Sequence, residues 1–385
     1  MSQRLLLGLA LGSGREGIDA VLVRVVGNGL AAVPAMERHV RHPLPPLVRD
    51  ALRRGESAPR DLADAFAAAA RQISAKGTIE LRSILLAGLH VAPGVPFDSL
   101  GERVAEQTGV SVWCRFAERD AAAGGAGRPW TPAADYLLAK SDSEDRILIH
   151  LGHAASVLAI PAGGKITDLV AFDAAPAGQL LDALIRLGTR EKESFDSGGT
   201  RAVQGKCHDD WLADWMTHPH LLRPPPKPLA NEFGPTFATA ALDAARHRNA
   251  GLADLLCTAT HFVARSIAAG VRQFVPPTGR PRALFVSGGG VRNGFLWQLL
   301  QQQFPGEVLR RTDDLGMPAL ARNAAAAAML AGLTLDGVAV NLPLLTGASG
   351  GRLVGRFIPG DPRNWAAVTA RAAEQMWDYG QLRAA

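Results

Sequence analysis

The sequence contains few cysteines and no closely spaced cysteine pair. Cys114, Cys207 and Cys257 lie far apart in a chain of 385 residues and form no C-x-x-C motif. We therefore interpret each of them as a small buried residue, and not as a metal ligand or a nucleophile. This cysteine usage is typical of a reducing compartment and favours a cytoplasmic location.

Long apolar runs and concentrated charge are also absent. No apolar stretch is long enough to span a bilayer, so no membrane segment is expected. The apolar run after Arg4 continues into Gly-Ser-Gly-Arg-Glu and not into a cleavage site of a signal peptide, so it is interpreted as a buried strand. A net charge of +5 without a Lys/Arg run argues against a nucleic-acid partner. The length favours two domains.

The first motif is a glycine-rich turn. Residues 12–17 read Gly-Ser-Gly-Arg-Glu-Gly and match G-x-G-x-x-G. A dinucleotide site requires a helix directly after these glycines. Residues 18–26 are instead rich in β-branched side chains, which favours a strand. We predict a β-hairpin over residues 5–26 whose turn either approaches a phosphate or is an ordinary tight turn.

Two later segments extend this pattern. Residues 146–162 repeat the strand, glycine turn and strand, and residues 282–287 form a strand that leads into Gly288-Gly289-Gly290 and a helix. Asn293 lies at the start of that helix, where it could cap the helix or contact a ribose or phosphate. Together the three segments predict a nucleotide held between two related α/β domains.

A carboxylate precedes a further glycine-rich segment. Asp120 follows a strand predicted over 111–116 and is followed by residues 121–127, which contain three glycines. Such a residue could act as a base beside a phosphate, although a helix cap or a turn is the commoner use. His90, after a strand over 83–89, is interpreted as a hydrogen-bonded loop residue. The remaining elements predicted are helices over 60–74, 99–108, 179–187, 236–247, 251–274, 294–303, 319–333 and 363–377, and a strand over 166–172.

An ordered set of motifs carries a resemblance to a known family. The matching residues are Gly17 to Val23, Asp120 with Gly124-Gly125, Phe172-Asp173, Arg223 to Lys227 ahead of Glu232-Phe233, Ser287 to Gly290 with Arg292-Asn293, Thr312 to Gly316, and Asn341 to Ser349. In this order they resemble the anhydro-N-acetylmuramic acid kinases, which belong to the actin/hexokinase/Hsp70 superfamily.

The resemblance implies a fold and an activity. The expected fold class is α/β, with two RNase H-like domains and an interdomain cleft, over 1–140 plus about 345–385 and over 141–344. The family opens the 1,6-anhydro ring of a cell-wall sugar with water and phosphorylates O6 from Mg-ATP. The resemblance thus implies ATP and Mg²⁺ as cofactors, a small sugar as substrate, a role in peptidoglycan recycling, and a homodimer.

The resemblance also implies roles for individual residues. Asp120 would be the catalytic base that activates the water, and His90 and Asn323 would contact the sugar. No metal ligand is predicted. The residues expected to contact the nucleotide are Gly12, Ser13, Gly14, Glu16, Gly17, Asp19, Gly152, His153, Asp173, Gly288, Gly289, Gly290 and Asn293.

Several positions depart from the family pattern, mainly near the expected phosphates and sugar. These positions are Gly14, Arg15, Glu16, Ala117, Ala174, Ala177 and Asn323. Two functions are therefore predicted. One is an ATP-dependent sugar kinase of this family. The other is a catalytically impaired relative that binds a nucleotide, a sugar or a protein partner.

Overall fold

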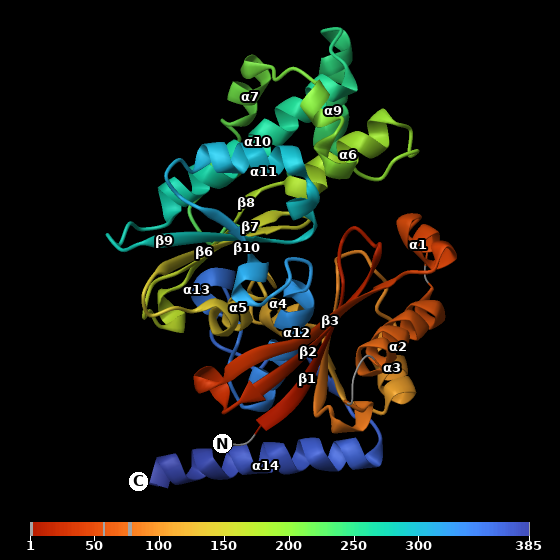
Figure 1. Ribbon diagram of the computed structural model, residues 1–385, viewed down its shortest axis with the longest axis vertical. Helices are drawn as coiled ribbons and strands as arrows, with labels where there is room; N and C mark the ends of the chain where they lie inside the picture. The colour runs from red at the N-terminus through yellow and green to blue at the C-terminus, as the bar shows by residue number, and fades with distance from the viewer. Residues whose placement is uncertain (1–2, 57, 76–78, 385) are drawn as a thin grey trace. The chain divides into compact units, whose positions relative to one another are not determined.

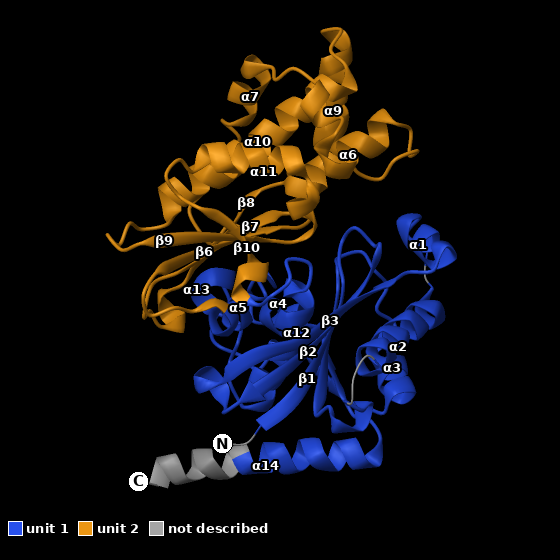
Figure 2. Ribbon diagram, in the orientation of Figure 1, with its two compact units in different colours: residues 1–138, 316–385 blue, residues 139–315 orange. Residues whose placement is uncertain are grey.

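The chain forms two compact units. The structure, a computed structural model, describes residues 3–56, 58–75 and 79–384, and for residues 375–384 it describes the backbone alone. Unit 1 comprises Met1–Leu138 and Gly316–Ala385, and unit 2 comprises Ala139–Leu315 (Figure 2). Each unit contains one mixed β-sheet with helices packed against it (Figure 1).

The sheet of unit 1 is built on the predicted hairpin. Its strand order is β11-β5-β4-β1-β2-β3. Strands β1, β2 and β3 are antiparallel, whereas β4 and β5 continue the sheet on the other side of β1 in parallel. The strands are β1 (Gln3–Leu11), β2 (Gly17–Val26), β3 (Val33–Pro43), β4 (Leu86–Val91), β5 (Val112–Cys114) and β11 (Arg356–Ile358).

Helices pack on both faces of this sheet. Alternate residues of a strand point to opposite faces, and Leu7, Leu9 and Leu11 of β1 lie in one buried core with the apolar stripe of α2. Gly8 faces the other way, toward α12. The helices of this unit are α1 (Pro46–Arg53), α2 (Pro59–Ala75), α3 (Leu100–Thr108), α4 (Phe116–Ala122), α5 (Pro132–Ala139), α12 (Arg322–Leu335), α13 (Pro343–Thr346) and α14 (Pro362–Ala384).

Two glycines let α12 lie unusually close to the sheet. A Cβ on Gly8 of β1 would lie 1.8 Å from the backbone oxygen of Ala324, and a Cβ on Gly88 of β4 would lie 1.9 Å from that of Ala327. No side chain fits in either place. The helix α12 is alanine-rich and almost fully buried, so small side chains on the helix and glycines on the strands together allow this close contact.

Unit 2 repeats this plan. Its strand order is β10-β9-β6-β7-β8, with β6, β7 and β8 antiparallel and β9 and β10 parallel to β6. The strands are β6 (Asp145–Leu151), β7 (Ala155–Ile160), β8 (Val170–Ala175), β9 (Arg282–Ser287) and β10 (Leu309–Arg311). The helices are α6 (Ala177–Gly188), α7 (Asp209–Trp215), α8 (Pro219–Leu222), α9 (Pro235–His247), α10 (Leu252–Phe274) and α11 (Gly294–Gln303).

The shared topology confirms the predicted fold class. In both units the first strand is central, two antiparallel strands follow on one side, and two parallel strands follow on the other. This is the RNase H-like strand order, and the chain contains it twice. The hairpin β1-β2 of unit 1 corresponds to the hairpin β6-β7 of unit 2, and β9, the strand before Gly288, corresponds to β4.

Three local expectations differ from the structure. No element was predicted between the first hairpin and residue 60, but residues 33–53 include β3 and α1; β3 is an edge strand whose side chains are mostly half-exposed or exposed. Asp120, predicted at a strand end before a glycine-rich loop, lies in the last turn of the short helix α4. Residues 316–344, expected in the second domain, belong to unit 1 because α12 packs on β1 and β4.

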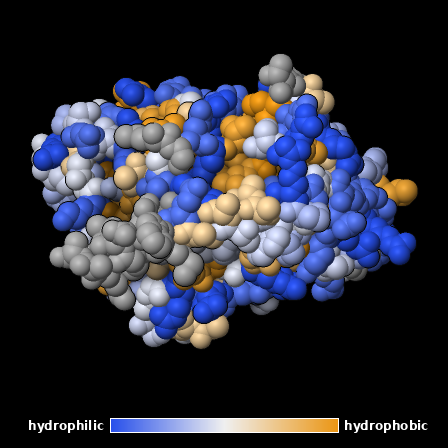
Figure 3. Space-filling model, turned by 90° about the horizontal axis from the view of Figure 1, so that it is seen from below, coloured by the Kyte–Doolittle hydropathy of each residue, from blue (hydrophilic) through white to orange (hydrophobic). Residues whose placement is uncertain are grey.

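The surface is mixed in character. On the face drawn in Figure 3, hydrophobic patches are separated by hydrophilic side chains. Among the residues that the structure describes, no helix is both long and apolar enough to cross a membrane.

The close contact between α12 and β4 makes a testable prediction. We expect Gly88→Ala to lower the free energy of unfolding by about 3 kcal/mol, because the added methyl group meets a backbone oxygen that cannot move alone. Denaturant unfolding of the purified variant measures this change. Gly294→Ala is the matched control, since its Cβ would find its nearest neighbour at 3.6 Å. Equal stability of both variants would contradict the account of this contact.

Candidate active site

The predicted site residues of unit 1 gather at one edge of its sheet. The glycine turn 12–17 follows β1, His90 lies near the end of β4, and Asp120 follows β5 on α4. Since β1, β4 and β5 are parallel, their carboxyl ends meet at the same edge. Ligands of open α/β sheets commonly bind beyond these ends.

The first turn is held by α1. The Arg15 guanidinium donates to the backbone oxygens of Leu52 and Gly94. The Glu16 carboxylate forms ion pairs with Arg53 at 2.7 Å and with Arg49 at 3.6 Å. The Arg15 side chain is thus directed at backbone carbonyls of unit 1, and the Glu16 carboxylate is paired with two arginines.

Two other residues predicted to contact a nucleotide have contacts within the sheet. A Cβ on Gly17 would lie 2.7 Å from the backbone oxygen of His42, so this glycine allows β3 to lie close. Asp19 is almost fully buried and pairs with His39 at 3.0 Å and Arg41 at 3.3 Å across β3. These contacts give both residues a role in joining β2 to β3.

Asp120 is a buried carboxylate with several donors around it. Its side chain accepts hydrogen bonds from the Thr346 hydroxyl at 2.7 Å, the Asn341 amide at 2.9 Å and the Gly127 backbone N–H at 2.8 Å. A Cβ on Gly125 would lie 2.2 Å from one carboxylate oxygen, so only glycine fits there. The glycine-rich segment therefore folds around the carboxylate and supplies a donor to it.

Aromatic side chains cover the other side of Asp120. A cavity of about 10 Å³ is lined by Asp120, Phe116 and Trp130 together with Gly127, Pro129, Val340, Asn341, Thr346 and Val354. This volume is close to what one water molecule needs. The rings of Phe116 and Trp130 lie almost parallel, with centroids 5.9 Å apart. A single small molecule of the size of water thus fits beside the carboxylate.

The two predicted sugar contacts lie near this aromatic cluster or on α12. His90 stacks on Trp130 with ring centroids 4.0 Å apart. Burial of the imidazole, with the nearby Arg322 charge, lowers the pKa of His90 to about 3, so the ring is neutral at pH 7. Asn323 lies half-buried in the first turn of α12, directly after Arg322, which is ion-paired with the buried Asp135.

In unit 2 the second and third glycine turns adjoin each other. A Cβ on Gly288 would lie 2.5 Å from the backbone oxygen of Leu151, and Gly290 meets the Leu151 side chain in the same way. Gly289, between them, has no atom within 4 Å of a Cβ position among the described residues. The turn thus exposes backbone that a ligand can approach closely.

The second hairpin turn is docked onto the start of α6. The backbone oxygens of Gly152 and His153 accept hydrogen bonds from the N–H groups of Gly178 and Gln179, at 3.1 and 2.8 Å. These helix-terminal donors are therefore used by the turn itself. Ala177, one of the positions that depart from the family pattern, does not prevent the turn from packing on α6, since the hydrogen bond to Gly152 is made by the N–H of Gly178.

Asp173 and Asn293 have structural partners in unit 2. The Asp173 carboxylate accepts from the Leu229 backbone N–H at 2.8 Å. Asn293 caps α11 through a hydrogen bond from the Leu296 N–H at 2.9 Å, as one of its two predicted roles required.

Sequence reasoning missed three residues at Asp120. Asn341 and Thr346 lie more than 200 residues further along the chain, so no spacing rule connects them to the carboxylate. They do fall inside the segment Asn341 to Ser349 that carried the family resemblance, which was the available signal. Trp130 gave no signal, because a lone tryptophan in a loop is not typical of any site.

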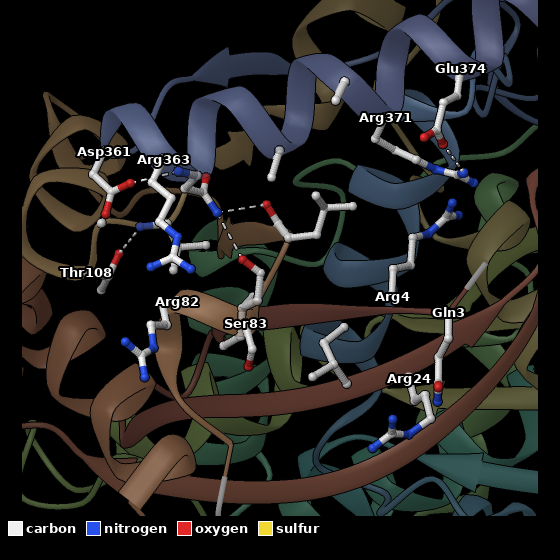
Figure 4. Close-up of a pocket in the computed structure, with 18 residues that line it drawn as sticks. Gln3, Arg4, Arg24, Arg82, Ser83, Thr108, Asp361, Arg363, Arg371 and Glu374 are labelled. Atoms are coloured by element: carbon white, nitrogen blue, oxygen red, sulfur yellow. Dashed lines mark hydrogen bonds and ion pairs between the residues drawn. The ribbon is translucent and has the colours of Figure 1, made fainter.

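A larger cavity lies elsewhere in unit 1. It has a volume of about 610 Å³ and lies between the start of β1, the segment before β4, and α14 (Figure 4). The arginines on its wall are mostly paired: Arg4 with Asp336, Arg24 with Glu37, and Arg371 with Glu374. Because it adjoins the amino ends of β1 and β4, it is separate from the candidate site.

Comparison with known proteins identifies the family. The family model for anhydro-N-acetylmuramic acid kinase matches residues 99–360, which is more than half of the chain and includes Asp120 and Thr346. The chain belongs to the anhydro-N-acetylmuramic acid kinase family. A relative of that name from Gloeobacter violaceus is 33% identical over 383 residues, covering 93% of this chain and 98% of the relative.

Other members of the family match over a similar length. The anhydro-N-acetylmuramic acid kinase of Salinibacter ruber is 32% identical over 388 residues, covering 93% of this chain and 97% of the relative. That of Xanthomonas axonopodis pv. citri is 32% identical over 381 residues, covering 92% of this chain and 98% of the relative. The match to the anhydro-N-acetylmuramic acid kinases thus extends over both units.

A titratable group lies next to the second turn. Asp182 is on α6, and one of its carboxylate oxygens lies 3.3 Å from the position that a Cβ on Gly178 would take. Burial raises the pKa of Asp182 to about 7, although the Arg186 charge opposes this. The side chain therefore changes charge near neutral pH beside a turn expected to face phosphate.

This shift predicts a pH-dependent stability. An unfolded aspartate ionises near pH 4, whereas native Asp182 keeps its proton to about pH 7. The native state binds more protons in this window, so the contribution of Asp182 to stability falls as pH rises from about 4 to about 7. We expect Asp182→Asn to gain stability relative to the wild type across that window and to keep the gain above it.

Denaturant unfolding at pH 4, 5, 6, 7 and 8 measures the difference. Asp142→Asn, at an exposed position, should give a difference that does not change with pH. A pH-independent difference for Asp182→Asn would contradict the shift.

Proposed function

We propose that the protein is an ATP-dependent sugar kinase that opens the 1,6-anhydro ring of anhydro-N-acetylmuramic acid with water and phosphorylates O6. The observation that carries this proposal is the buried Asp120 carboxylate, held by hydrogen bonds beside a cavity of about 10 Å³. Family membership supports the choice of substrate.

Asp120 acts as a general base in this scheme. It takes one proton from water, whose oxygen then bonds to the anomeric carbon of the sugar. The bond between that carbon and O6 breaks, and O6 would then bond to the γ-phosphorus of ATP as the bond from that phosphorus to the β–γ bridging oxygen breaks and ADP leaves. The proton taken from water stays on the Asp120 carboxyl until solvent removes it. The aromatic rings of Phe116 and Trp130 limit the space beside the carboxylate and keep bulk solvent away from it. General-base catalysis of this kind contributes roughly 10²- to 10⁴-fold in rate.

Exposed glycine backbone fits the nucleotide. Neither Gly12 in the first turn nor Gly289 in the third has an atom within 4 Å of a Cβ position among the described residues. Backbone N–H groups of such turns can approach phosphate oxygens without obstruction. We assign the first turn to the phosphates and Gly288 to Gly290 to adenosine.

Protein ligands for Mg²⁺ are not assigned. Mg²⁺ that accompanies a nucleotide is usually held by one or two carboxylates together with phosphate oxygens. The carboxylates nearest the first turn, Glu16 and Asp19, are already paired with arginine or histidine side chains. The described residues contain no cluster of three or more potential metal ligands. These residues do not fit a protein-held Mg²⁺, and no step is derived through it.

The catalytically impaired alternative is not favoured. The position where damage would matter most, Asp120, accepts three hydrogen bonds from protein groups. Arg15, which could have blocked a phosphate, is directed at the carbonyls of Leu52 and Gly94. A homodimer and a cytoplasmic location remain predictions.

Replacing the carboxylate tests the proposed function. We expect Asp120→Asn to lower turnover by roughly 10²- to 10⁴-fold, because an amide cannot accept the proton of water. Formation of the sugar 6-phosphate from anhydro-N-acetylmuramic acid and Mg-ATP, followed by mass spectrometry, measures this change. Asp243→Asn, in an exposed ion pair on α9, is the control and should be unaffected. Absence of product with the wild-type protein would overturn the proposal.

A further inference from the structure

We propose that Thr346 and Asn341 are positioning residues that fill one oxygen of the Asp120 carboxylate and leave the other, Oδ2, to accept the proton. This inference rests on the proposed function and adds residues from the distant C-terminal part of the chain. It also assigns the reactive atom.

The assignment follows from the distribution of donors. A carboxylate oxygen has two lone pairs that can accept hydrogen bonds. Oδ1 of Asp120 accepts from the Thr346 hydroxyl and the Asn341 amide, so both of its lone pairs are used. Oδ2 accepts from the Gly127 N–H alone among the described residues. One lone pair of Oδ2 therefore remains, and it is the place where a proton can be accepted.

The segment that carries Asn341 and Thr346 is hydrogen-bonded to the loop after Asp120, which holds both donors in place. The Thr346 backbone oxygen accepts from the Ala126 N–H, and the Ser349 N–H donates to the Ala123 oxygen, both at 2.9 Å. These two bonds join the segment to the glycine-rich loop that follows Asp120. The segment and the loop thus form one unit around the carboxylate.

Asn341 is itself held in orientation. Its amide also donates to the Gly350 oxygen at 3.2 Å, and its side-chain oxygen accepts from the Arg352 backbone N–H at 2.5 Å. The side chain is therefore oriented by both of its ends. Asn341 and Thr346 are both buried.

The described hydrogen-bond donors to Asp120 are all uncharged groups. No charged side chain of the described residues is among the hydrogen-bond partners of Asp120 or the residues that line its cavity with it. The charged and titratable groups on the neighbouring elements are Glu118 and Arg119, which are exposed on α4, and Arg128 and Arg352 in the adjoining loops. His90 stacks on Trp130, and Arg322, whose charge acts on His90, is ion-paired with Asp135. Neutral donors to a carboxylate favour its ionised form.

Thr346→Val isolates the contribution of one donor. Valine keeps the shape of threonine but cannot donate, so Oδ1 loses one bond and the carboxylate binds a proton more readily. We expect kcat to fall about 10-fold and the acidic limb of the pH profile of kcat/KM to move up by about one pH unit, with KM for ATP unchanged. Thr346→Ser, which restores the hydroxyl, should recover both.

Thr334→Val is the matched control. Thr334 is as deeply buried as Thr346, but its hydroxyl has no hydrogen-bond partner in the described structure. This variant should leave the pH profile unchanged. Thermal unfolding of all variants at one pH distinguishes a variant that no longer folds from one in which only the Asp120 carboxylate is no longer held in place.

A second measurement does not need activity. The ¹³C signal of the Asp120 carboxyl, assigned by its loss in Asp120→Asn, is followed through a pH titration of wild type and Thr346→Val. A midpoint about one unit higher in the variant supports the proposal even if the wild-type protein forms no product, in which case the proposed function alone fails. An unchanged midpoint, or a pH profile that moves equally in Thr334→Val, overturns the proposal.

Discussion

The contact of α12 with Gly8 and Gly88 is the constraint on which the candidate site depends. Protein interiors are packed too densely for a helix backbone to lie this close to a strand that carries side chains. Gly8 and Gly88 carry no side chain, so the alanine-rich α12, which follows unit 2 in the chain, packs on β1 and β4 of unit 1. The segment with Asn341 and Thr346 follows α12 directly and so meets Asp120, which lies on α4, the helix that follows β5.

The two units use one strand plan for different chemistry. In unit 1 the edge where parallel strands end carries a buried carboxylate, aromatic rings and a turn braced by α1. In unit 2 the equivalent edge carries glycine turns packed on each other and on the start of α6. The first edge offers a buried carboxylate and a cavity of the size of one water molecule, whereas the second offers exposed glycine backbone.

Much of the fold could be predicted from the sequence, because it rests on local patterns. Both hairpins, the helix over residues 60–74 and the strand before Gly288 follow from periodicity and glycine turns. Strand β3 was missed, since its polar alternation lies on a half-exposed edge. The site was predicted only in part. Asp120 was assigned through the family resemblance, because its local motif left a helix cap or a turn open. Its donors come from distant sequence, and the contacts of Asp19 with β3 depend on strand register. Contacts between residues so far apart in the chain cannot be predicted from local composition.

A double-mutant cycle on stability tests the central claim that Asp120 and the C-terminal segment act as one unit. The free energy of unfolding at pH 7 is measured for the wild type, Asp120→Asn, Thr346→Val and the double variant. Hydrogen bonds to charged groups are worth about 1.5–3 kcal/mol, so we predict a coupling energy of this size. Additive effects, with a coupling energy near zero, would contradict the account.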